Sequence, residues 1–150
     1  LQVGGLSEGR HTLKIDGQSV GSWTAKEFAD GINVATNPKT PQYQQAVRVS
    51  KVSARSWLAG NSKRHLIGNL RLLRLRRLTT KEAQLKYMRS RRAPASGVAR
   101  ERHEEFIRLL AEGRIEAVID EAIRKSVSLN EQAYLAAKPV SHEFELVLER

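Results

Sequence analysis

The sequence predicts an α+β fold, with a small antiparallel sheet made from the two ends of the chain and several α-helices that make up most of the middle. Three observations predict it. Asp16-Gly17 separates two alternating segments, and both residues tolerate the positive φ of a type I′ hairpin turn. From Gln42 onward, apolar side chains recur at helical spacing instead. His142 to Leu148 alternates again, which predicts a C-terminal strand that adds to the sheet.

Residues 1–36 are expected to form the sheet together with one short helix. The expected strands are 1–3, 10–16 and 19–23. Thr24 and Glu27 fit a capping box, in which the hydroxyl accepts the backbone N–H three residues on and the carboxylate reaches back. Gly31 is placed to end that helix in the left-handed conformation, because glycine has no Cβ to clash.

Residues 41–92 are expected to form a basic helical segment that starts with Pro41 in its first turn. The expected buried face of its first helix consists of Tyr43, Val47, Ser50, Ala54, Trp57 and Leu58. Gly60-Asn61-Ser62 weakens or ends that helix. Residues 65–78 fit a helix, or a strand with a bulge at Leu72-Leu73, and we prefer the helix. Thr79 and Glu82 form a second Thr-x-x-Glu box, from which another helix runs to about Arg91.

The second half of the chain is predicted to contain a linker, two helices and the last strand. Residues 93–97 are the linker, because they are rich in proline, alanine, serine and glycine. Residues 98–138 form a helical segment that is interrupted at Gly113 and then either continues or restarts at Ser128. Residues 142–148 return to the sheet, so that all segments belong to one domain.

The net charge of +10 is concentrated in one block. Residues 48–97 carry fourteen basic side chains and one acidic one, whereas residues 98–150 carry eight basic and eleven acidic side chains. Such a block either binds a polyanion or pairs with the Glu-rich segment 101–121, and we favour the internal pairing. The candidate polyanion contacts are Arg64, Arg71, Arg74, Arg76 and Arg77.

No catalytic, metal-ligating or cofactor-binding constellation is visible. The sequence has no cysteine and no Gly-x-Ser-x-Gly elbow, and His11, His65, His103 and His142 show no metal-ligand spacing. We therefore expect no catalytic residue, no metal and no cofactor. No apolar run is long enough to cross a membrane.

The order of several motifs resembles the C-terminal region of bacterial SGNH/GDSL hydrolases of the planctomycete type. The matching stretches are Leu1–Leu6, Leu13–Gly17, Thr24–Ala35, Gln44–Val47 and Ala136–Leu146. In that family an upstream flavodoxin-like domain carries the nucleophilic serine, Gly and Asn oxyanion donors and an Asp-x-x-His pair. This sequence contains no Asp-x-x-His, so the resemblance transfers no catalytic residue to it.

The resemblance implies a parent enzyme that cleaves an acyl or acetyl ester, and a carbohydrate-linked ester is one substrate that it suggests. It also implies that the parent enzyme is secreted or periplasmic. The chain is then a non-catalytic appendage whose partner is the catalytic SGNH domain of the same parent chain. It also opens on Leu1 rather than Met, which we interpret as a fragment. The less favoured alternatives are a nucleic-acid-binding module formed by residues 63–92 and a structural or protein-interaction segment.

Overall fold

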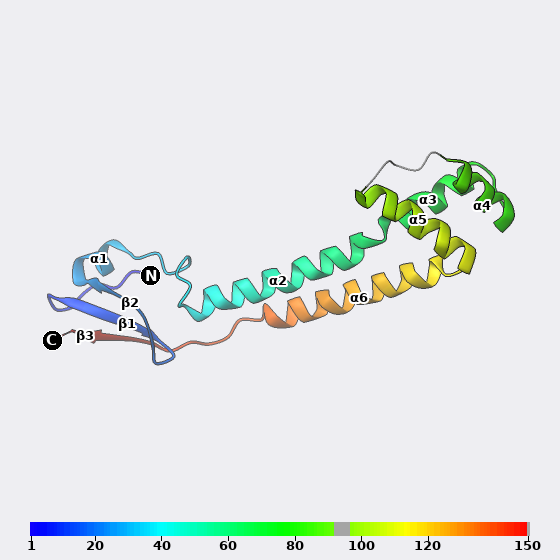
Figure 1. Cartoon of the computed structure of the whole chain (residues 1–150). Helices are drawn as coiled ribbons and strands as arrows, with labels where there is room; N and C mark the ends of the chain where they lie inside the picture. The colour runs from blue at the N-terminus through cyan, green and yellow to red at the C-terminus, as the bar shows by residue number, and fades with distance from the viewer. Residues whose placement is uncertain (92–96, 150) are drawn as a thin grey trace. The chain divides into compact units, whose positions relative to one another are not determined.

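A computed structural model describes residues 1–91 and 97–149 and confirms the α+β fold (Figure 1). Most of the predicted linker lies outside the described residues, and Gly97 is the first residue of α5. The elements are β1 (Arg10–Ile15), β2 (Gln18–Thr24), α1 (Ala25–Asp30), α2 (Pro41–Ser62), α3 (Arg64–Leu75), α4 (Lys81–Ser90), α5 (Gly97–Glu112), α6 (Ile115–Ala136) and β3 (Phe144–Leu148).

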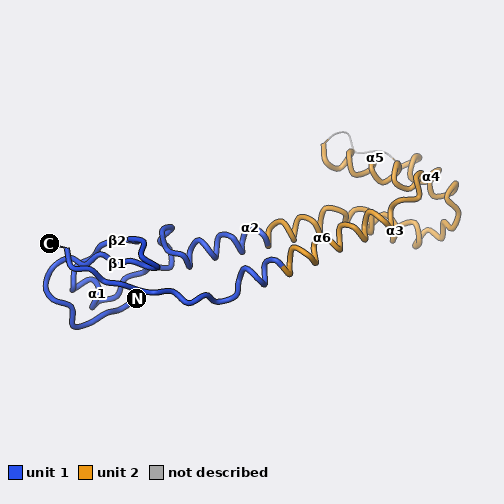
Figure 2. Tube along the Cα trace, turned by 90° about the horizontal axis from the view of Figure 1, so that it is seen from below, with its two compact units in different colours: residues 1–52, 132–150 blue, residues 53–131 orange. Residues whose placement is uncertain are grey.

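The chain divides into two compact units (Figure 2). Residues 1–52 and 132–150 form unit 1, which contains the sheet and α1, and residues 53–131 form unit 2, which contains α3, α4 and α5. Helices α2 and α6 contribute residues to both units. Each unit has its own hydrophobic core, and each is described below by itself.

The sheet of unit 1 has the strand order β2-β1-β3, and both pairings are antiparallel. Its hairpin turn is confirmed, since Asp16 and Gly17 have φ values of 53° and 76°. The predicted strand at residues 1–3 is wrong. Val3 N–H donates to the carbonyl of Phe28, and Ile32 N–H donates to the carbonyl of Leu1, so this segment binds the helix α1 region instead of a strand.

Helix α1 begins at the predicted capping box. Thr24 Oγ1 accepts from the backbone N–H of Glu27, and the Glu27 carboxylate accepts from the backbone N–H of Thr24 at 2.7 Å. Gly31 caps the other end with a positive φ of 101°, but its ψ of 127° lies outside the left-handed helical region that we predicted. Phe28 is fully buried and meets Trp23 edge to face at a centroid distance of 5.7 Å.

Helix α2 has the predicted ends but a different buried face. Trp57 and Leu58 are 65% and 60% exposed, whereas Ser56 is buried. Ser56 Oγ lies 2.9 Å from the carbonyl oxygen of Ser126 and 2.7 Å from Oδ1 of Asn130, both on α6. Small residues allow this close approach of two helices in unit 2, so packing selects the polar seam and leaves the large apolar side chains outside.

The other helices of unit 2 surround a core of Leu66, Leu73, Met88, Phe106, Leu109, Leu110 and Ile115. Residues 64–75 are helical, as preferred, and α6 continues through Ser128 without a restart. The second capping box is wrong by one residue. Thr80, not Thr79, is the N-cap of α4, and its hydroxyl accepts from the N–H of Ala83, so Glu82 has no part in a reciprocal box.

Candidate functional site

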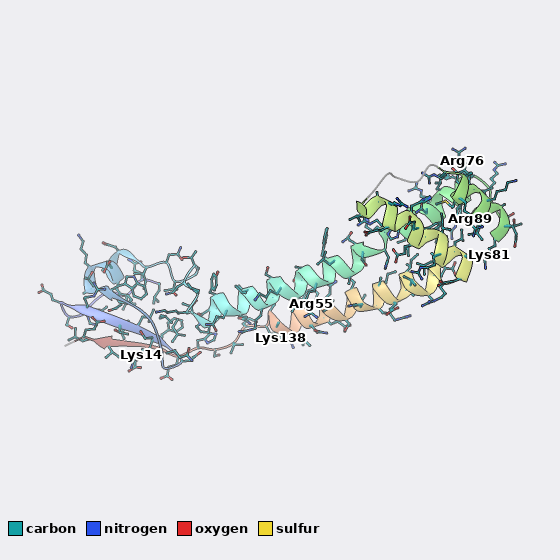
Figure 3. The ribbon with its side chains drawn as sticks, viewed as in Figure 1. Lys14, Arg55, Arg76, Lys81, Arg89 and Lys138 are labelled. Atoms are coloured by element: carbon teal, nitrogen blue, oxygen red, sulfur yellow. The ribbon has the colours of Figure 1, made fainter. Side chains whose placement is uncertain are left out.

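The five predicted polyanion contacts lie on α3 or directly after it, and all are exposed. Arg64, Arg71 and Arg74 belong to the helix, Arg76 is its C-cap and Arg77 follows. Figure 3 shows Arg76 in the same helical unit as Lys81 and Arg89 of α4. The structure therefore distributes the five predicted contacts along α3, from its first residue to the two residues that follow its C-terminus.

One side of α3 combines arginines with exposed aliphatic side chains. At 3.6 residues per turn, its members fall within an arc of roughly 100°. We name this side the α3 cationic face, and its members are Arg64, Ile67, Arg71, Arg74 and Leu75. Ile67 is 50% exposed and Leu75 is 73% exposed. The opposite side of α3 carries the core residues Leu66 and Leu73, so the cationic face is the outward side of the helix.

The C-terminus of α3 is closed by a Schellman motif in which the left-handed residue is an arginine. Leu78 N–H donates to the carbonyl of Leu73 at 3.1 Å, Arg77 N–H donates to the carbonyl of Arg74 at 2.9 Å, and Arg77 has a φ of 53°. Glycine is the usual residue at this position, because a Cβ in the left-handed region costs about 1–2 kcal/mol. Arg77 therefore sits in a strained backbone conformation.

The basic block is mostly unpaired. Among residues 1–91 and 97–149, no ion pair with a carboxylate is formed by Arg71, Arg74, Arg76 or Arg77. Two carboxylates of α5, those of Glu104 and Glu112, instead bind arginines of their own helix or just after it, in the pairs Arg100–Glu104, Arg108–Glu112 and Arg114–Glu112. We expected the basic block to pair with the Glu-rich segment 101–121. In the described part of the block, only Lys63 and His65 form such a pair, both with Glu105.

Lys63, His65 and Glu105 form the most enclosed titratable cluster of unit 2. Lys63 Nζ lies 2.5 Å from Glu105 Oε1, and His65 Nε2 lies 3.0 Å from Glu105 Oε2 without the alignment of a hydrogen bond. Burial lowers the pKa of His65 despite the attraction of Glu105. Burial raises the pKa of Glu105, but the hydrogen bond and charge of Lys63 outweigh it and leave that pKa lowered. No hydroxyl of the described residues binds this cluster, so it holds charge but lacks a serine or threonine nucleophile.

A pocket of about 290 Å³ opens between α3, α4, α5 and α6 in unit 2. Leu70, Leu73 and Leu110 supply apolar wall, and Arg74 and Glu116 supply opposite charges. The pocket is large enough for a small molecule but contains no serine, cysteine or histidine. It therefore offers space for binding without the serine, cysteine or histidine of a serine- or cysteine-hydrolase site.

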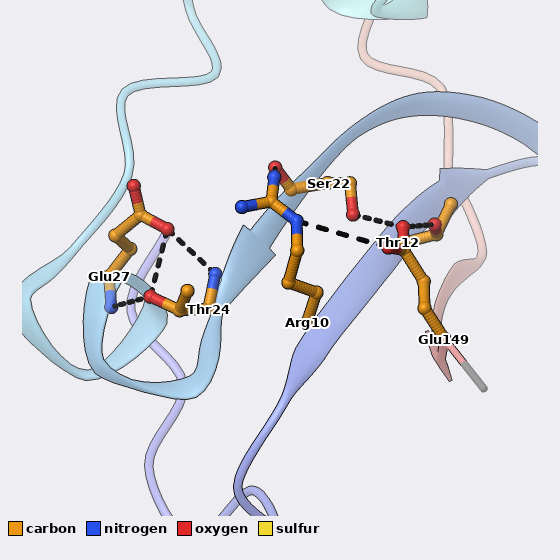
Figure 4. A network of polar contacts seen from close by, with 6 residues as sticks. All are labelled: Arg10, Thr12, Ser22, Thr24, Glu27 and Glu149. Carbon is orange, nitrogen blue, oxygen red and sulfur yellow. Dashed lines mark hydrogen bonds and ion pairs between the residues drawn. The ribbon is translucent and has the colours of Figure 1, made fainter.

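A polar network in unit 1 fixes the edges of the sheet (Figure 4). The Glu149 carboxylate accepts hydrogen bonds from Thr12 Oγ1 and Ser22 Oγ and lies 3.8 Å from Arg10 Nε. Hydrogen bonds from Ser22 and Thr12 lower the pKa of Glu149. The two hydroxyls belong to β1 and β2, so this carboxylate links the hairpin to the end of the third strand.

Asp16 and His142 form a second link across the sheet. His142 Nδ1 lies 2.7 Å from Asp16 Oδ2, and the backbone N–H of Glu143 donates to Asp16 Oδ1 at 3.0 Å. The hydrogen bond to His142 is the main cause that lowers the pKa of Asp16. An Asp–His pair is two of the three members of a catalytic triad, but no serine hydroxyl is hydrogen-bonded to His142 among the described residues.

No other arrangement of catalytic type is present in the part of the chain that the structure describes. His11 Nε2 lies 2.9 Å from the carbonyl oxygen of Ser7, which is a structural contact. The described residues contain no cluster of three or more acidic or histidine side chains that suits a metal ion. None of their helices is long and apolar enough to cross a membrane.

A comparison with solved structures gives a structural neighbour. No family model matches the chain, and no curated protein matches it. A solved structure described as a gut microbial diltiazem-metabolizing enzyme matches 97% of this chain with a TM-score of 0.76 and 26% sequence identity. The match covers 32% of that enzyme, so the chain spans about a third of the length of the neighbour.

Sequence reasoning missed two of the clusters described above. Asp16 was identified as a turn residue, but nothing local indicates that its carboxylate binds His142, which is 126 positions away. Likewise, Lys63 and Glu105 are separated by 42 positions, and only the general charge pattern suggested a pairing. The left-handed conformation of Arg77 leaves no sequence signal at all.

Proposed function

We propose that this chain is a non-catalytic segment of a larger ester hydrolase of the SGNH/GDSL type. One observation supports the part of this proposal that makes the chain a segment of a larger enzyme: 97% of the chain resembles 32% of a solved structure described as a gut microbial diltiazem-metabolizing enzyme. The SGNH/GDSL type of the parent rests on the motif order of the sequence alone. In this proposal the serine nucleophile and its histidine base belong to a catalytic domain outside these residues, and that domain is the partner of the chain.

The side chains of the chain are consistent with a supporting role. Its two Asp or Glu contacts to histidine, Asp16–His142 and Glu105–His65, have no serine within hydrogen-bonding reach among the described residues. Ester cleavage by a serine needs a hydroxyl next to a base and donors for the oxyanion. The polar groups of unit 1 instead join strands to one another. The proposed contribution of the segment is to pack beside the catalytic domain and shape the entrance for substrate.

The test compares the purified 150-residue chain with the same chain preceded by the coding sequence upstream of Leu1. Hydrolysis of p-nitrophenyl acetate and loss of diltiazem are measured for both. We expect turnover only from the longer protein, and we expect its loss when the serine of an upstream Gly-Asp-Ser motif is replaced by alanine. Turnover by the pure 150-residue chain would refute the non-catalytic role, and the same measurement on His142→Ala and His65→Ala variants would then show whether either histidine acts as the base.

Nucleic-acid binding by residues 63–92 is the second candidate. The unpaired arginines of the α3 end favour it, because each phosphate neutralised releases counterions. The shortage of aromatic side chains on which bases could stack argues against it. Tyr87 is half-buried, and the Arg76 guanidinium lies 6.0 Å from its ring centre. Affinity for duplex or single-stranded DNA at about 50 mM salt, where several phosphate contacts are strong, is the direct test.

A further inference from the structure

We propose that the α3 cationic face binds the surface of a membrane that contains anionic lipids. The proposal is independent of the hydrolase assignment, because it concerns only groups that unit 2 itself presents. It assigns a partner to a surface that takes part in neither the cores nor the ion pairs of residues 1–91 and 97–149.

The α3 cationic face lies in a strongly basic stretch of the chain. From Lys63 to Lys81 the chain carries seven basic side chains and no acidic one. Arg71 and Arg74 are exposed and form no ion pair with a carboxylate of the described residues, so their charge faces solvent. A guanidinium binds phosphate through two parallel hydrogen bonds, and the negative potential of an anionic leaflet attracts such groups. Charge complementarity therefore fits a layer of lipid phosphates.

The arginines of the α3 cationic face are accompanied by two exposed aliphatic side chains. Ile67 and Leu75 are at least half exposed and share the outward side of α3 with Arg71. A phosphate backbone alone gives no reason for exposed isoleucine and leucine at these positions. At a bilayer surface, aliphatic side chains enter the acyl boundary while long basic side chains keep their charged ends at the headgroups. A lipid surface thus uses both features of the face, whereas a nucleic acid uses one.

Arg77, directly after the α3 cationic face, has a strained backbone conformation. This residue adopts a φ of 53° at the end of α3, in a position where glycine closes the equivalent turn of α5. Strained conformations that persist are found preferentially at functional positions. A requirement for positive charge next to the α3 cationic face accounts for an arginine there.

The experiment measures co-sedimentation of the 150-residue chain with vesicles of phosphatidylcholine alone or mixed with phosphatidylglycerol. We expect binding to the mixed vesicles only, weakened by added salt. Arg71→Gln and Arg74→Gln should each lower the partition coefficient roughly fivefold. Leu75→Ser should lower it as well, with an unchanged dependence on salt, because it removes an apolar contact and no charge.

Two matched controls separate this face from general surface effects. Leu58 is 60% exposed on α2, and Arg124 is exposed on α6. Leu58→Ser and Arg124→Gln should leave vesicle binding unchanged, and far-UV circular dichroism checks that every variant is folded.

Three results would overturn the proposal: no binding to the mixed vesicles, equal binding to neutral vesicles, or equal losses in control and test variants. Tighter binding to duplex DNA that is unaffected by Leu75→Ser would assign the face to nucleic acid instead.

Discussion

The two Schellman motifs of unit 2 allow a paired test of backbone strain. Helix α5 ends with Gly113 at a φ of 70°, and Arg114 N–H donates to the carbonyl of Leu109 at 3.0 Å. Helix α3 ends in the same way with Arg77 at a φ of 53°. We predict that Gly113→Ala destabilises unit 2 and that Arg77→Gly stabilises it, because the first introduces a Cβ in the left-handed region and the second removes one.

The magnitude follows from the surroundings of each residue. A Cβ added to Gly113 meets no heavy atom within 4 Å, so its cost is conformational and contains no steric clash. The left-handed conformation destabilises the folded state by about 1–2 kcal/mol for a residue with a Cβ. Alanine also has less conformational entropy than glycine in the unfolded chain, which offsets this cost by about 0.4–1 kcal/mol. The expected net change is a loss of about 0.5–1 kcal/mol for Gly113→Ala and a similar gain for Arg77→Gly.

Urea unfolding followed by far-UV circular dichroism measures both changes, and amide exchange of the buried α5 residues reports on unit 2 alone. Gly68 supplies the matched control. It lies inside α3 and a Cβ there also meets no atom within 4 Å, but its backbone is helical, so Gly68→Ala should stabilise by about 0.5–1 kcal/mol. The reasoning is refuted if Gly113→Ala and Gly68→Ala change stability in the same direction, or if Arg77→Gly destabilises the protein.

Three further predictions concern the cap of α4, the core of unit 2 and the partly buried His65. Thr80→Ala should lower the free energy of unfolding by about 1 kcal/mol, since it removes the acceptor for the Ala83 N–H. Thr79→Ala should change this free energy by less than about 0.5 kcal/mol. Equal losses for the two variants in urea unfolding would contradict the assignment of Thr80 as the N-cap. Phe106→Ala should cost about 3–5 kcal/mol in the same measurement, because Phe106 is fully buried in the core of unit 2, and a loss below about 1 kcal/mol would show that this core is not formed. Burial lowers the pKa of His65, so the unfolded chain binds more protons than the folded one just below about pH 6.5, and stability should fall as the pH is lowered through that window. The slope of stability against pH between about pH 7.5 and about pH 5.5 should become shallower in His65→Gln, and an unchanged slope would exclude this origin.

The features that sequence reasoning predicted correctly are those decided by a few neighbouring residues. Asp16-Gly17 tolerates positive φ at both positions, which fixes the turn and thereby the pairing of β1 with β2. Thr24 and Glu27 satisfy each other within one helical turn. In both cases all the interacting atoms lie within four consecutive residues, so no knowledge of tertiary structure is needed.

The errors arise where packing chooses between similar local options. Thr79 and Thr80 are adjacent threonines, and the presence of Glu82 favoured the first, but the helix starts after the second. On α2, hydrophobicity selected the side with Trp57 and Leu58, whereas the helices approach each other through Ser56 and other small residues. The choice depends on the shape of the opposing helix, which the α2 sequence does not contain.

The candidate surface shows a similar division. The concentration of arginine between residues 63 and 81 was visible in the sequence and identifies the surface correctly as basic. Whether those charges are neutralised depends on where the carboxylates of α5 point. Helical i, i+4 spacing gives Arg100–Glu104 and Arg108–Glu112 partners on the same helix, so these acids bind locally instead of reaching α3.

Asp16 shows why a correct local explanation of a residue is incomplete. A type I′ turn accepts asparagine as readily as aspartate, so the turn alone does not account for the carboxylate. In the folded chain one carboxylate oxygen accepts the Glu143 N–H and the other binds His142 Nδ1. An amide has only one acceptor oxygen and would present an NH₂ group to one of these partners. The lowered pKa of Asp16 has the same cause, since both contacts favour the charged form. The residue that turns the first hairpin is therefore also the residue that holds the start of β3 against the sheet, and this second role uses both carboxylate oxygens.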